Sequence, residues 1–434
     1  MRVLFLSNFY PPASRGGYEQ WCQEVTEGLR ARGHEVVVLT SRHGQSLVKG
    51  TEPAWIVRDL YLEMELASLR NAVQFFTQRK VREQANLTRL RQIVESFQPD
   101  VVLMWGMWNL PRSLPALAEA LLPHRVAYYM GDYWPTLPNQ FTYYWQEPGR
   151  HWASALPKRL LGAVAHRILA QEERPALKFE HVMFPTAFMR DELQRQGITP
   201  KESVVIYGAV DTDPYLTCTS LPQEQRDVSI RLLFVGRLAS EKGVHTVVEA
   251  LGRLVYRYGY NQLQLSVVGA GDNGYEAYLQ ELIKQEKVQP YVTLLGMQPK
   301  ETMPALYAQA DLFLFASIWP EPFGRVLVEA MAAGLAVVGT ATGGAAEILV
   351  DGENALVFPP GDVEGLAACI ARLIDSPELR RRLVDRGRQH ALQKFSIQRM
   401  TAEIELQLRM ITEGESVQIA ERRGKDQCRL QNLN

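Results

Sequence analysis

Two cations stand five positions apart in the stretch VGRLASEKG, residues 235–243. Arg237 follows a glycine that permits a tight turn after an apolar run, and Lys242 lies at the start of a predicted helix. The N–H groups at a helix start attract anions, and an Arg fork beside a Lys point charge suits a diphosphate. The segment therefore predicts an anion site, with a solvated turn that pairs Lys242 with Glu241 as the alternative.

Two carboxylates with seven residues between them occur in EPFGRVLVE, residues 321–329. Glu321 lies in a predicted loop, and Glu329 lies on the helix that begins near Phe323. Carboxylates accept hydrogen bonds from hydroxyl groups, so Glu329 fits a ribose diol and Glu321 a second sugar. One alternative is a glycosidase, in which the two carboxylates would be the acid and the nucleophile, but this would leave Arg237 and Lys242 without a role. A capping Glu with a surface Glu is the other alternative.

A glycine pair, Gly16 and Gly17, follows the first predicted strand in YPPASRGGYE. Glycines there let backbone N–H groups approach a phosphate or substrate at a helix start, although a flexible loop would read the same way. Nine aromatic residues follow between Tyr128 and Trp152. Together they favour a platform for sugar rings, with Asp132 as a polar contact, although core packing is the alternative for each ring.

Other patterns exclude several classes of site. VVGAGDNG, residues 267–274, contains GxGxxG, but the next predicted strand brings no acidic residue, which argues against a dinucleotide. The four cysteines form no CxxC pair and the eight histidines show no metal spacing, so we expect no metal site and a reducing, cytosolic setting. The 47 basic and 48 acidic residues argue against a nucleic-acid binder.

These residues need elements that position them, and the 434-residue chain alternates apolar strands with amphipathic helices. The first half predicts strands at Val3–Leu6, Glu35–Thr40, Val101–Met104, Val126–Met130, His181–Thr186 and Ser203–Asp211. The second half predicts strands within 231–238, 264–271, 291–297, 311–317, 335–340 and 354–360. Helices are predicted from Gly17 to Gly33, over one long region at 66–97, and at Ser376–Arg388 and Ser396–Met410.

Two successive α/β patterns of about 200 residues predict two facing Rossmann-like domains. We expect an N-terminal domain at 1–200, a C-terminal domain at 201–395, a helix at 396–412 that packs back on the N-terminal domain, and a polar tail at 413–434. The main linker is expected within or just before 212–229. The apolar run at Val3–Leu6 reads as a strand rather than a signal peptide, and no membrane-spanning helix is expected.

Taken together, these motifs resemble the retaining glycosyltransferases of family 4, also described as group 1, with the GT-B fold. The resemblance spans nearly the whole chain and is strongest from Arg231 to Phe358, where the motifs follow the family order almost without gaps. It implies a cleft between the two domains and a nucleotide-diphosphate sugar as co-substrate, with no cofactor and no metal.

The resemblance also implies roles for single residues. Arg237 and Lys242 would bind the donor diphosphate, Glu329 the ribose and Glu321 the donor sugar. The backbone at Phe323 and Gly324 would help to hold the donor, and that at Gly16 and Gly17 would close on the phosphates. The chain departs from the family where Gly131 replaces a histidine and where Leu103 and Trp105 stand in a strand that often carries histidines. Asp132 is then the residue expected to orient the acceptor.

The sequence thus predicts a retaining, metal-independent hexosyltransferase that acts in cell-envelope or exopolysaccharide synthesis. A nucleotide-sugar epimerase of the same fold and a non-catalytic partner that binds nucleotide sugar are the alternatives. The acceptor would be a glycan, a lipid-linked sugar or a small molecule, and the nucleotide UDP, GDP or ADP. Basic residues at Arg70–Arg91 and beside Leu160–Ala165 fit either a solvated helix face or peripheral contact with the inner face of a membrane.

Overall fold

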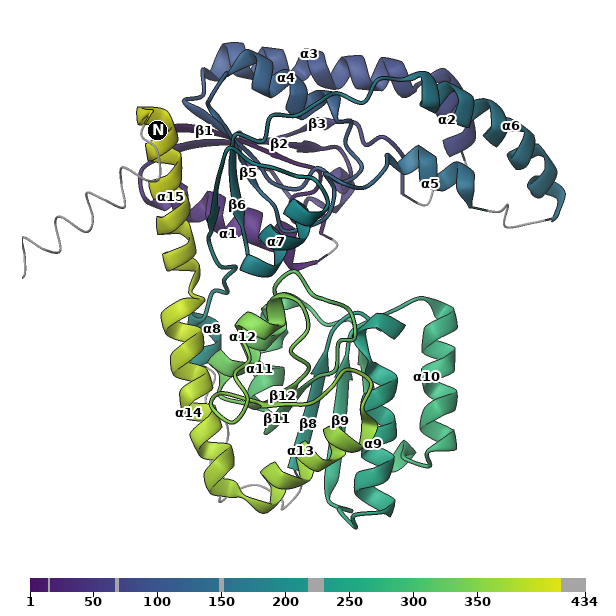
Figure 1. Cartoon of the computed structure of the whole chain (residues 1–434), viewed down its shortest axis with the longest axis vertical. Helices are drawn as coiled ribbons and strands as arrows, with labels where there is room; N and C mark the ends of the chain where they lie inside the picture. The colour runs from purple at the N-terminus through teal and green to yellow at the C-terminus, as the bar shows by residue number, and fades with distance from the viewer. Residues whose placement is uncertain (15, 67–69, 148–151, 218–229, 415–434) are drawn as a thin grey trace, which may run out of the picture. The chain divides into compact units, whose positions relative to one another are not determined.

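A computed structural model describes residues 1–14, 16–66, 70–147, 152–217 and 230–414 (Figure 1). The chain divides into two compact units. The first unit contains Met1–Phe184, Arg190–Ile206 and the chain from Thr401 onward. The second unit contains Pro185–Met189 and Tyr207–Met400. Within the described residues, none of the helices is both long and apolar enough to cross a membrane.

The first unit is built on a seven-stranded parallel sheet with the order β3-β2-β1-β4-β5-β6-β7. Its strands are β1 (Arg2–Ser7), β2 (Glu35–Ser41), β3 (Ile56–Leu60), β4 (Val101–Met104), β5 (Val126–Tyr129), β6 (His181–Phe184) and β7 (Glu202–Val205). The two central strands β4 and β5 are buried along their whole length, because helices cover both faces of a parallel sheet. Their sequences are accordingly continuous apolar or aromatic runs.

Helices alternate with these strands along the chain. They are α1 (Gly17–Ala31), α2 (Asn71–Thr77), α3 (Arg79–Phe97), α4 (Ser113–Leu121), α5 (Gln140–Gln146), α6 (Trp152–Gln171) and α7 (Ala187–Arg195), with a short 3₁₀ turn η1 (Gln45–Leu47). The last helix, α15 (Ile397–Glu413), packs against α1 in this unit, where Gly28 leaves room for the side chain of Thr401. This agrees with the predicted return of the C-terminal helix.

The second unit contains a six-stranded parallel sheet with the order β10-β9-β8-β11-β12-β13. Its strands are β8 (Ile230–Val235), β9 (Leu263–Val268), β10 (Val292–Gly296), β11 (Leu312–Phe315), β12 (Ala336–Gly339) and β13 (Leu356–Val357). Its helices are α8 (Asp213–Thr217), α9 (Val244–Tyr256), α10 (Asn273–Gln285), α11 (Met303–Ala308), α12 (Arg325–Ala333), α13 (Val363–Asp375) and α14 (Pro377–Lys394). Short 3₁₀ turns are η3 (Ser240–Lys242), η4 (Gln289–Tyr291), η5 (Lys300–Thr302) and η6 (Gly344–Glu347).

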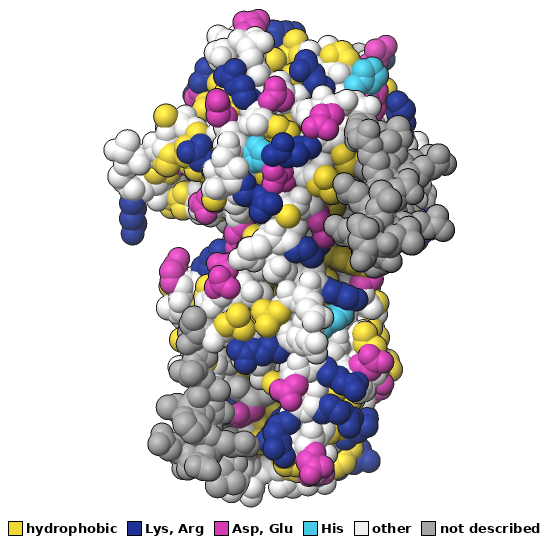
Figure 2. Space-filling model, turned by 90° about the vertical axis from the view of Figure 1, so that its left-hand side faces the viewer, with side chains coloured by type: hydrophobic (Ala, Val, Ile, Leu, Met, Phe, Trp, Pro, Cys, Tyr) yellow, Lys and Arg dark blue, Asp and Glu magenta, His cyan; other side chains and the backbone are white. Residues whose placement is uncertain are grey.

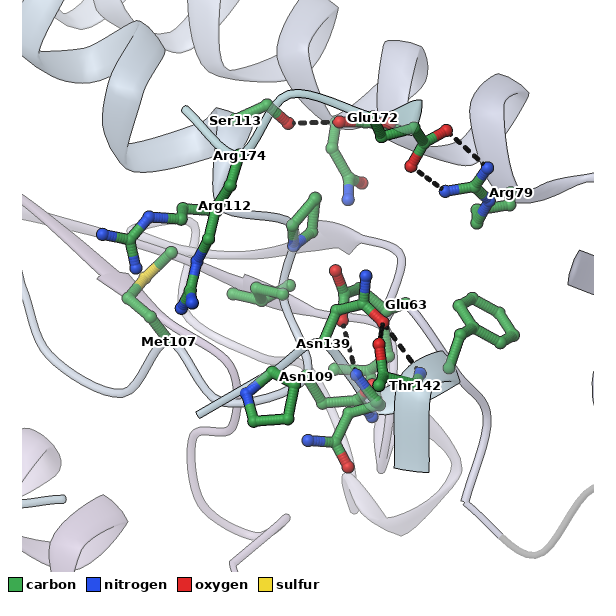
Figure 3. A pocket seen from close by; sticks show the side chains of 18 of the residues that line it. Glu63, Arg79, Met107, Asn109, Arg112, Ser113, Asn139, Thr142, Glu172 and Arg174 are labelled. Atoms are coloured by element: carbon green, nitrogen blue, oxygen red, sulfur yellow. Dashed lines mark hydrogen bonds and ion pairs between the residues drawn. The ribbon is translucent and has the colours of Figure 1, made fainter. Parts of the chain in front are cut away.

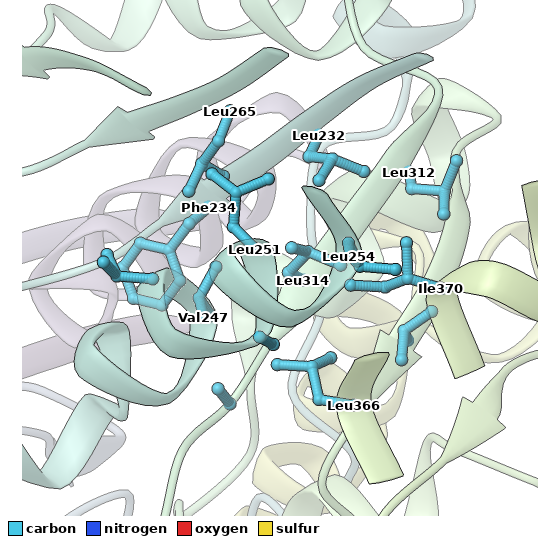
Figure 4. Packing of buried hydrophobic residues seen from close by; sticks show 14 of the residues in the cluster. Leu232, Phe234, Val247, Leu251, Leu254, Leu265, Leu312, Leu314, Leu366 and Ile370 are labelled. Carbon is cyan, nitrogen blue, oxygen red and sulfur yellow. The ribbon is translucent and has the colours of Figure 1, made fainter. Parts of the chain in front are cut away.

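The core of the second unit joins α9 and α13 to one face of this sheet. Figure 4 shows Val247 and Leu251 of α9 and Leu366 of α13 pointing toward strand residues such as Leu232 and Leu314. The loops of the site extend from the ends of these packed strands. On the face drawn in Figure 2, Lys and Arg side chains are interspersed with Asp and Glu, as the net charge of −1 suggests.

The structure corrects two of the predicted elements and adds one strand. The helical region at 66–97 is two helices, because the chain breaks at Gln78. The strand predicted at Ser203–Asp211 ends at Val205. Strand β3 was not predicted, because Arg58 and Asp59 interrupt its apolar pattern. The described part of the predicted linker forms α8, and residues 218–229 and the tail from 415 lie outside the described residues.

Candidate active site

The loop after β8 carries both predicted cations, and each of them contacts a carboxylate. Lys242 Nζ forms an ion pair with Glu321 Oε1, and the two side chains are only 22% and 13% exposed. Arg237 Nη2 donates to Glu241 Oε1 at 2.7 Å and is 65% exposed. The structure therefore brings together two predicted site residues that are 79 positions apart, and leaves Arg237 on an open surface.

Glycines let the loops of this edge approach each other closely. Gly243, between η3 and α9, has a φ of 69°, and a Cβ there would lie 2.0 Å from the carbonyl oxygen of Ala316. Gly269 and Gly271 pack in the same way against the backbone after β8, where a Cβ on Gly269 would lie 1.8 Å from the oxygen of Gly236. The first two glycines of the GxGxxG pattern thus serve loop packing in this unit.

Glu321 is fixed from two sides. Ser317 Oγ donates to its Oε1 at 2.9 Å. Its backbone forms a β-bridge with Gly343, and the N–H of Gly344 donates to its carbonyl oxygen at 2.6 Å. Because Ser317 follows β11 and Gly343 follows β12, two neighbouring strand ends of the sheet hold this carboxylate in place.

Glu329 lies on α12 and is 9% exposed. Tyr307 donates to Oε2 at 3.0 Å, and Arg325 Nε to Oε1 at 3.2 Å. Burial and the neighbouring carboxylate raise the pKa of Tyr307 well above its ordinary value, so its hydroxyl stays a donor. Each carboxylate oxygen has two acceptor positions, and these two contacts use one on each oxygen.

The backbone that precedes α12 contains Phe323 and Gly324, the two residues predicted to help hold the donor. Gly324 adopts a left-handed φ of 108° immediately before the helix. Phe323 is buried, and its ring packs against Phe395 with the centroids 5.5 Å apart. The side chain of Phe323 therefore anchors the loop, and only its backbone can serve a ligand.

In the first unit, Gly16 and Gly17 lie at the start of α1. The N–H of Gly16 donates to Glu19 Oε2 at 3.0 Å, which caps the helix. Tyr18 points away from this turn, and its hydroxyl donates to the carbonyl oxygen of Trp105 at 2.8 Å. The glycine pair thus forms a turn that Glu19 holds in shape.

The departures from the family pattern meet around Tyr18. The indole of Trp105 stacks between the rings of Tyr18 and Tyr129, with centroids 5.7 Å and 4.5 Å away. A Cβ on Gly131 would lie 2.6 Å from the ring of Tyr18. An aromatic stack therefore fills the place where the family often carries histidines.

Asp132 follows directly and is half-buried. Burial raises its pKa to about 7, against a hydrogen bond from the backbone of Trp134 and with a contribution from the charge of Glu19. Its Oδ1 atom is buried and has no hydrogen-bond partner. A carboxyl group of this kind changes charge near neutral pH.

The aromatic platform predicted at 128–152 is wrong for most of its rings. Five of them are buried in the core, because they lie on β5 and α5 or on the turn between these elements: Tyr128, Tyr129, Trp134, Phe141 and Trp145. Tyr143 is exposed on α5. Residues 148–151 of this segment lie outside the described residues.

Sequence reasoning missed a pocket of about 310 Å³ within the first unit (Figure 3). Its walls come from the chain after β3, β4 and β5 and from the helices α3 and α6. Among the residues that line it are Glu63, Arg79, Arg112, Trp134 and Arg174. These residues are far apart in the chain and form no local motif, so no sequence signal could have grouped them. Within the described residues, no cluster of three or more His, Cys, Asp or Glu is placed to hold a metal ion.

Comparisons with known proteins agree with this architecture. A family model described as Glycosyltransferase Family 4 matches residues 15–214, and one described as Glycosyl transferases group 1 matches residues 222–390. A glycogen synthase of Mycobacterium tuberculosis is 28% identical over 413 residues, which cover 92% of each chain.

Solved structures are similar over almost the whole chain. A glycosyltransferase from Rickettsia africae superimposes with a TM-score of 0.68 at 20% identity, over 94% of this chain and 98% of that one. The Anabaena protein HepE, in complex with UDP and glucose, gives 0.65 at 20% identity, over 94% and 99%. This chain belongs to the group 1 and family 4 glycosyltransferases, and its two parallel sheets are those of the GT-B fold.

Proposed function

We propose that this chain is a retaining glycosyltransferase that moves a sugar from a nucleoside-diphosphate sugar to an acceptor held by the first unit. The observation that carries the proposal is the Lys242–Glu321 ion pair at the start of α9. It places a cation for the diphosphate beside a carboxylate for the hydroxyl groups of the donor sugar. Glu329 then receives the ribose, and Arg237 adds a second positive charge on an open surface.

The reaction breaks the bond between the anomeric carbon and the diphosphate oxygen and forms one from that carbon to the acceptor oxygen. The acceptor proton passes to the leaving phosphate. Lys242 and Arg237 stabilise the negative charge that develops on the phosphate, and fixed charges of this kind are worth about 10²–10³ in rate each. Because these cations supply the charge, we propose that no metal is needed, and EDTA should leave the rate unchanged.

Two features bear on the substrates. HepE was solved with UDP, which makes UDP the first candidate nucleotide, ahead of GDP and ADP. The names of relatives, such as glycogen synthase and a lipopolysaccharide core glycosyltransferase, support a role in glycan or cell-envelope synthesis. A nucleotide-sugar epimerase would interconvert the donor without an acceptor, and a non-catalytic partner would bind it unchanged.

A thermal-shift panel of UDP, GDP, ADP and their sugars tests the proposal. The proteins are the wild type, Lys242→Ala and the control Lys284→Ala, which removes an exposed lysine of α10 in the same unit. A ligand at 100 times its Kd stabilises the fold by about 2.7 kcal/mol. We expect one base class to stabilise the wild type and the control, and to lose most of that effect in Lys242→Ala.

The same variants then enter a transfer assay. We expect Lys242→Ala to lose at least 10²-fold in rate and Lys284→Ala to keep it. Nucleotides that stabilise none of the proteins, or that stabilise Lys242→Ala as much as the wild type, would contradict the proposed donor site.

We further propose that the protein makes peripheral contact with the inner face of an anionic cell membrane. Helices α2, α5 and α6 pack together around Phe75, Phe141 and Trp145 (Figure 1). Large apolar side chains remain exposed on α2 and α6: Val73, Phe76, Leu156, Leu160, Leu161 and Val164. Lys158 and Arg159 lie on the same helix as the last four. Apolar side chains beside cations favour an anionic lipid surface.

Sedimentation with phosphatidylglycerol vesicles, compared with phosphatidylcholine vesicles, tests this contact. We expect the wild type to sediment with the anionic vesicles only, and Leu160→Glu/Val164→Glu to stay in solution. Leu406→Glu, at an exposed position on α15, is the control. Equal sedimentation of the double variant and the wild type would contradict the proposal.

A further inference from the structure

The pocket of the first unit has two arginines at one end. Figure 3 shows the side chains of Arg112 and Arg174 beside each other, next to Met107. Arg112 begins the turn into α4, and Arg174 follows the end of α6. We propose that this pocket binds the acceptor and that Arg112 and Arg174 bind a phosphate or carboxylate group of that acceptor. The inference rests on the proposed function, because it names the class of acceptor for that reaction.

Shared hydrogen bonds hold the two guanidinium groups together. Arg112 Nη1 and Arg174 Nη2 both donate to the carbonyl oxygen of Pro135, each at 2.9 Å. Arg112 Nε also donates to Pro175 at 2.9 Å, and Arg174 Nη2 to Leu137 at 2.8 Å. Two positive charges that share one acceptor atom lie within a few ångströms of each other and repel.

The other cations of this pocket form ion pairs with carboxylates, whereas these two donate their hydrogen bonds to the backbone. Arg79 forms a two-pronged ion pair with Glu172, at 2.5 and 2.6 Å. Lys80 Nζ lies 3.0 Å from the same carboxylate. Across the described part of the chain, no carboxylate forms an ion pair with Arg112 or Arg174, and the hydrogen bonds of both side chains go to backbone carbonyl oxygens. Arg112 also lies over the rings of Trp134 and Phe179, 5.9 and 5.7 Å from their centroids.

This arrangement has a free-energy cost that an anion would relieve. Burial and the charge of Arg174 lower the pKa of Arg112 to about 10, against opposing contributions from Tyr128 and Glu119, so Arg112 stays charged at neutral pH. A guanidinium carries five N–H donors, and the bonds to the backbone use only some of them. An oxyanion between the two groups accepts the remaining donors and cancels the repulsion.

The rest of the pocket suits the body of a sugar. Leu137 and the edges of the largely buried Trp134 and Met107 supply apolar surface, and Glu63 supplies a carboxyl group. Burial raises the pKa of Glu63 to about 7, so much of it is neutral near that pH and repels an anion little. A volume of about 310 Å³ lies at the lower end of the range for small-molecule sites, which is enough for one sugar ring with its anionic group.

Anion titrations followed by thermal unfolding test the inference. The probes are sodium phosphate, glucose 6-phosphate and sodium glucuronate, each against sodium chloride of equal ionic strength, with glucose as the uncharged control. The proteins are the wild type, Arg174→Gln, Arg112→Gln/Arg174→Gln and the control Arg195→Gln, which removes an exposed charge from the same unit. Arg174 is exposed, so its single variant should fold even where the double variant does not.

We expect at least one anion to stabilise the wild type and Arg195→Gln, with an apparent Kd at least tenfold weaker in Arg174→Gln. The ranking of glucose 6-phosphate and glucuronate then tells phosphate from carboxylate. Equal stabilisation of the wild type and Arg174→Gln, including none in either, overturns the inference. Arg174→Lys keeps the charge and should keep more affinity than Arg174→Gln. If Arg174→Lys and Arg174→Gln lose the same affinity, Arg174 only positions its loop, and the inference is also overturned.

Nucleotide titrations on the same proteins separate this inference from the proposed function. UDP, GDP and ADP report on the donor residues of the second unit, and their affinities should change less than twofold in Arg174→Gln. If no nucleotide stabilises the wild type, the proposed function fails whatever the anions do. If nucleotides bind and the anions show no dependence on Arg174, only the inference about the acceptor fails.

Discussion

The ring of Tyr18 fills the space that a side chain on Gly131 would need. A Cβ at this glycine would lie 2.6 Å from Cε2 and 2.8 Å from Cδ2 of that ring. The ring cannot move away easily, because it stacks on Trp105 and its hydroxyl donates to the carbonyl oxygen of Trp105 and accepts from the N–H of Gly131. The absence of a histidine at position 131 and the presence of Tyr18 are therefore one structural feature.

Gly131→Ala should destabilise the protein by about 1–3 kcal/mol, as overpacking of a filled core does. Tyr18→Ala/Gly131→Ala should remove that extra cost, because the small residue opens the space. Urea unfolding of the two single variants and the double variant measures the coupling between the sites. If the two changes add without coupling, the ring does not exclude the side chain.

Gly243→Ala should damage both stability and donor binding. The left-handed φ of 69° costs an L-residue about 1–2 kcal/mol, and the contact with the carbonyl of Ala316 adds strain. Gly259 is the matched control, since its φ is 78° and a Cβ there meets nothing within 4 Å. We expect Gly259→Ala to lose stability only, and Gly243→Ala to lose nucleotide affinity as well, because Lys242 precedes it. Calorimetric titration with the preferred nucleotide distinguishes the two.

The transfer rate should follow the titration of Asp132. With a pKa of about 7, this carboxyl group is mostly protonated at pH 6 and mostly charged at pH 8. If the charged form orients the acceptor hydroxyl, kcat/KM rises across that interval. Asp132→Asn should flatten this rise and lower the rate most at high pH. An unchanged pH profile in the variant would exclude Asp132 from the reaction.

The free energy of unfolding of Asp132→Asn, relative to the wild type, should change with pH in the opposite direction to its transfer rate. Because the pKa of Asp132 is higher in the folded protein than its ordinary 3.8, the folded protein holds a proton that the unfolded chain releases between pH 4 and 7. The charged carboxylate therefore destabilises the wild type increasingly as pH rises through this range. Urea unfolding should show Asp132→Asn gaining on the wild type from pH 4 to pH 7 and holding that gain above it.

Glu405 should contribute stability that is lost in acid. Burial tends to raise the pKa of this carboxyl group, but hydrogen bonds from Arg409 and Arg32 outweigh burial and lower the pKa to about 2. Its contribution is thus present above its ordinary pKa of 4.5 and disappears as the pH falls toward 2. Glu405→Gln should lose about 1.5 kcal/mol at pH 7, and the difference from the wild type should shrink below pH 4.5. A constant difference across this range would contradict the assignment.

Apolar strand patterns predicted most of both sheets. Val101–Met104 is predicted as a strand and forms β4, whose four residues are all buried. The prediction succeeds because a central parallel strand needs apolar side chains on both faces. Strand β3 escaped prediction because its Arg58 is buried yet charged. Arg58 pairs with Glu52 and donates to the carbonyl of Tyr10, and these contacts exist only after folding.

The candidate site also contains some residues that the sequence could predict and others that it could not. Lys242 and Glu321 each lie in a local motif, so the sequence could propose both before their contact was known. Arg112 and Arg174 lie in no motif, and only the backbone carbonyl of Pro135 brings them together. The prediction of an aromatic platform on and after β5 was wrong because composition cannot distinguish a ring in a core from a ring on a surface.

The return of α15 to the first unit has a consequence for biosynthesis. Arg32 and Glu405 are 373 positions apart, so the ribosome adds Arg32 and His34 long before their shared partner. The N-terminal sheet can assemble while translation continues, but its outer layer waits until α15 has left the exit tunnel. A nascent or truncated chain that stops at α14 would expose the groove beside Gly28, and chaperones and proteases could distinguish it there from a chain that contains α15.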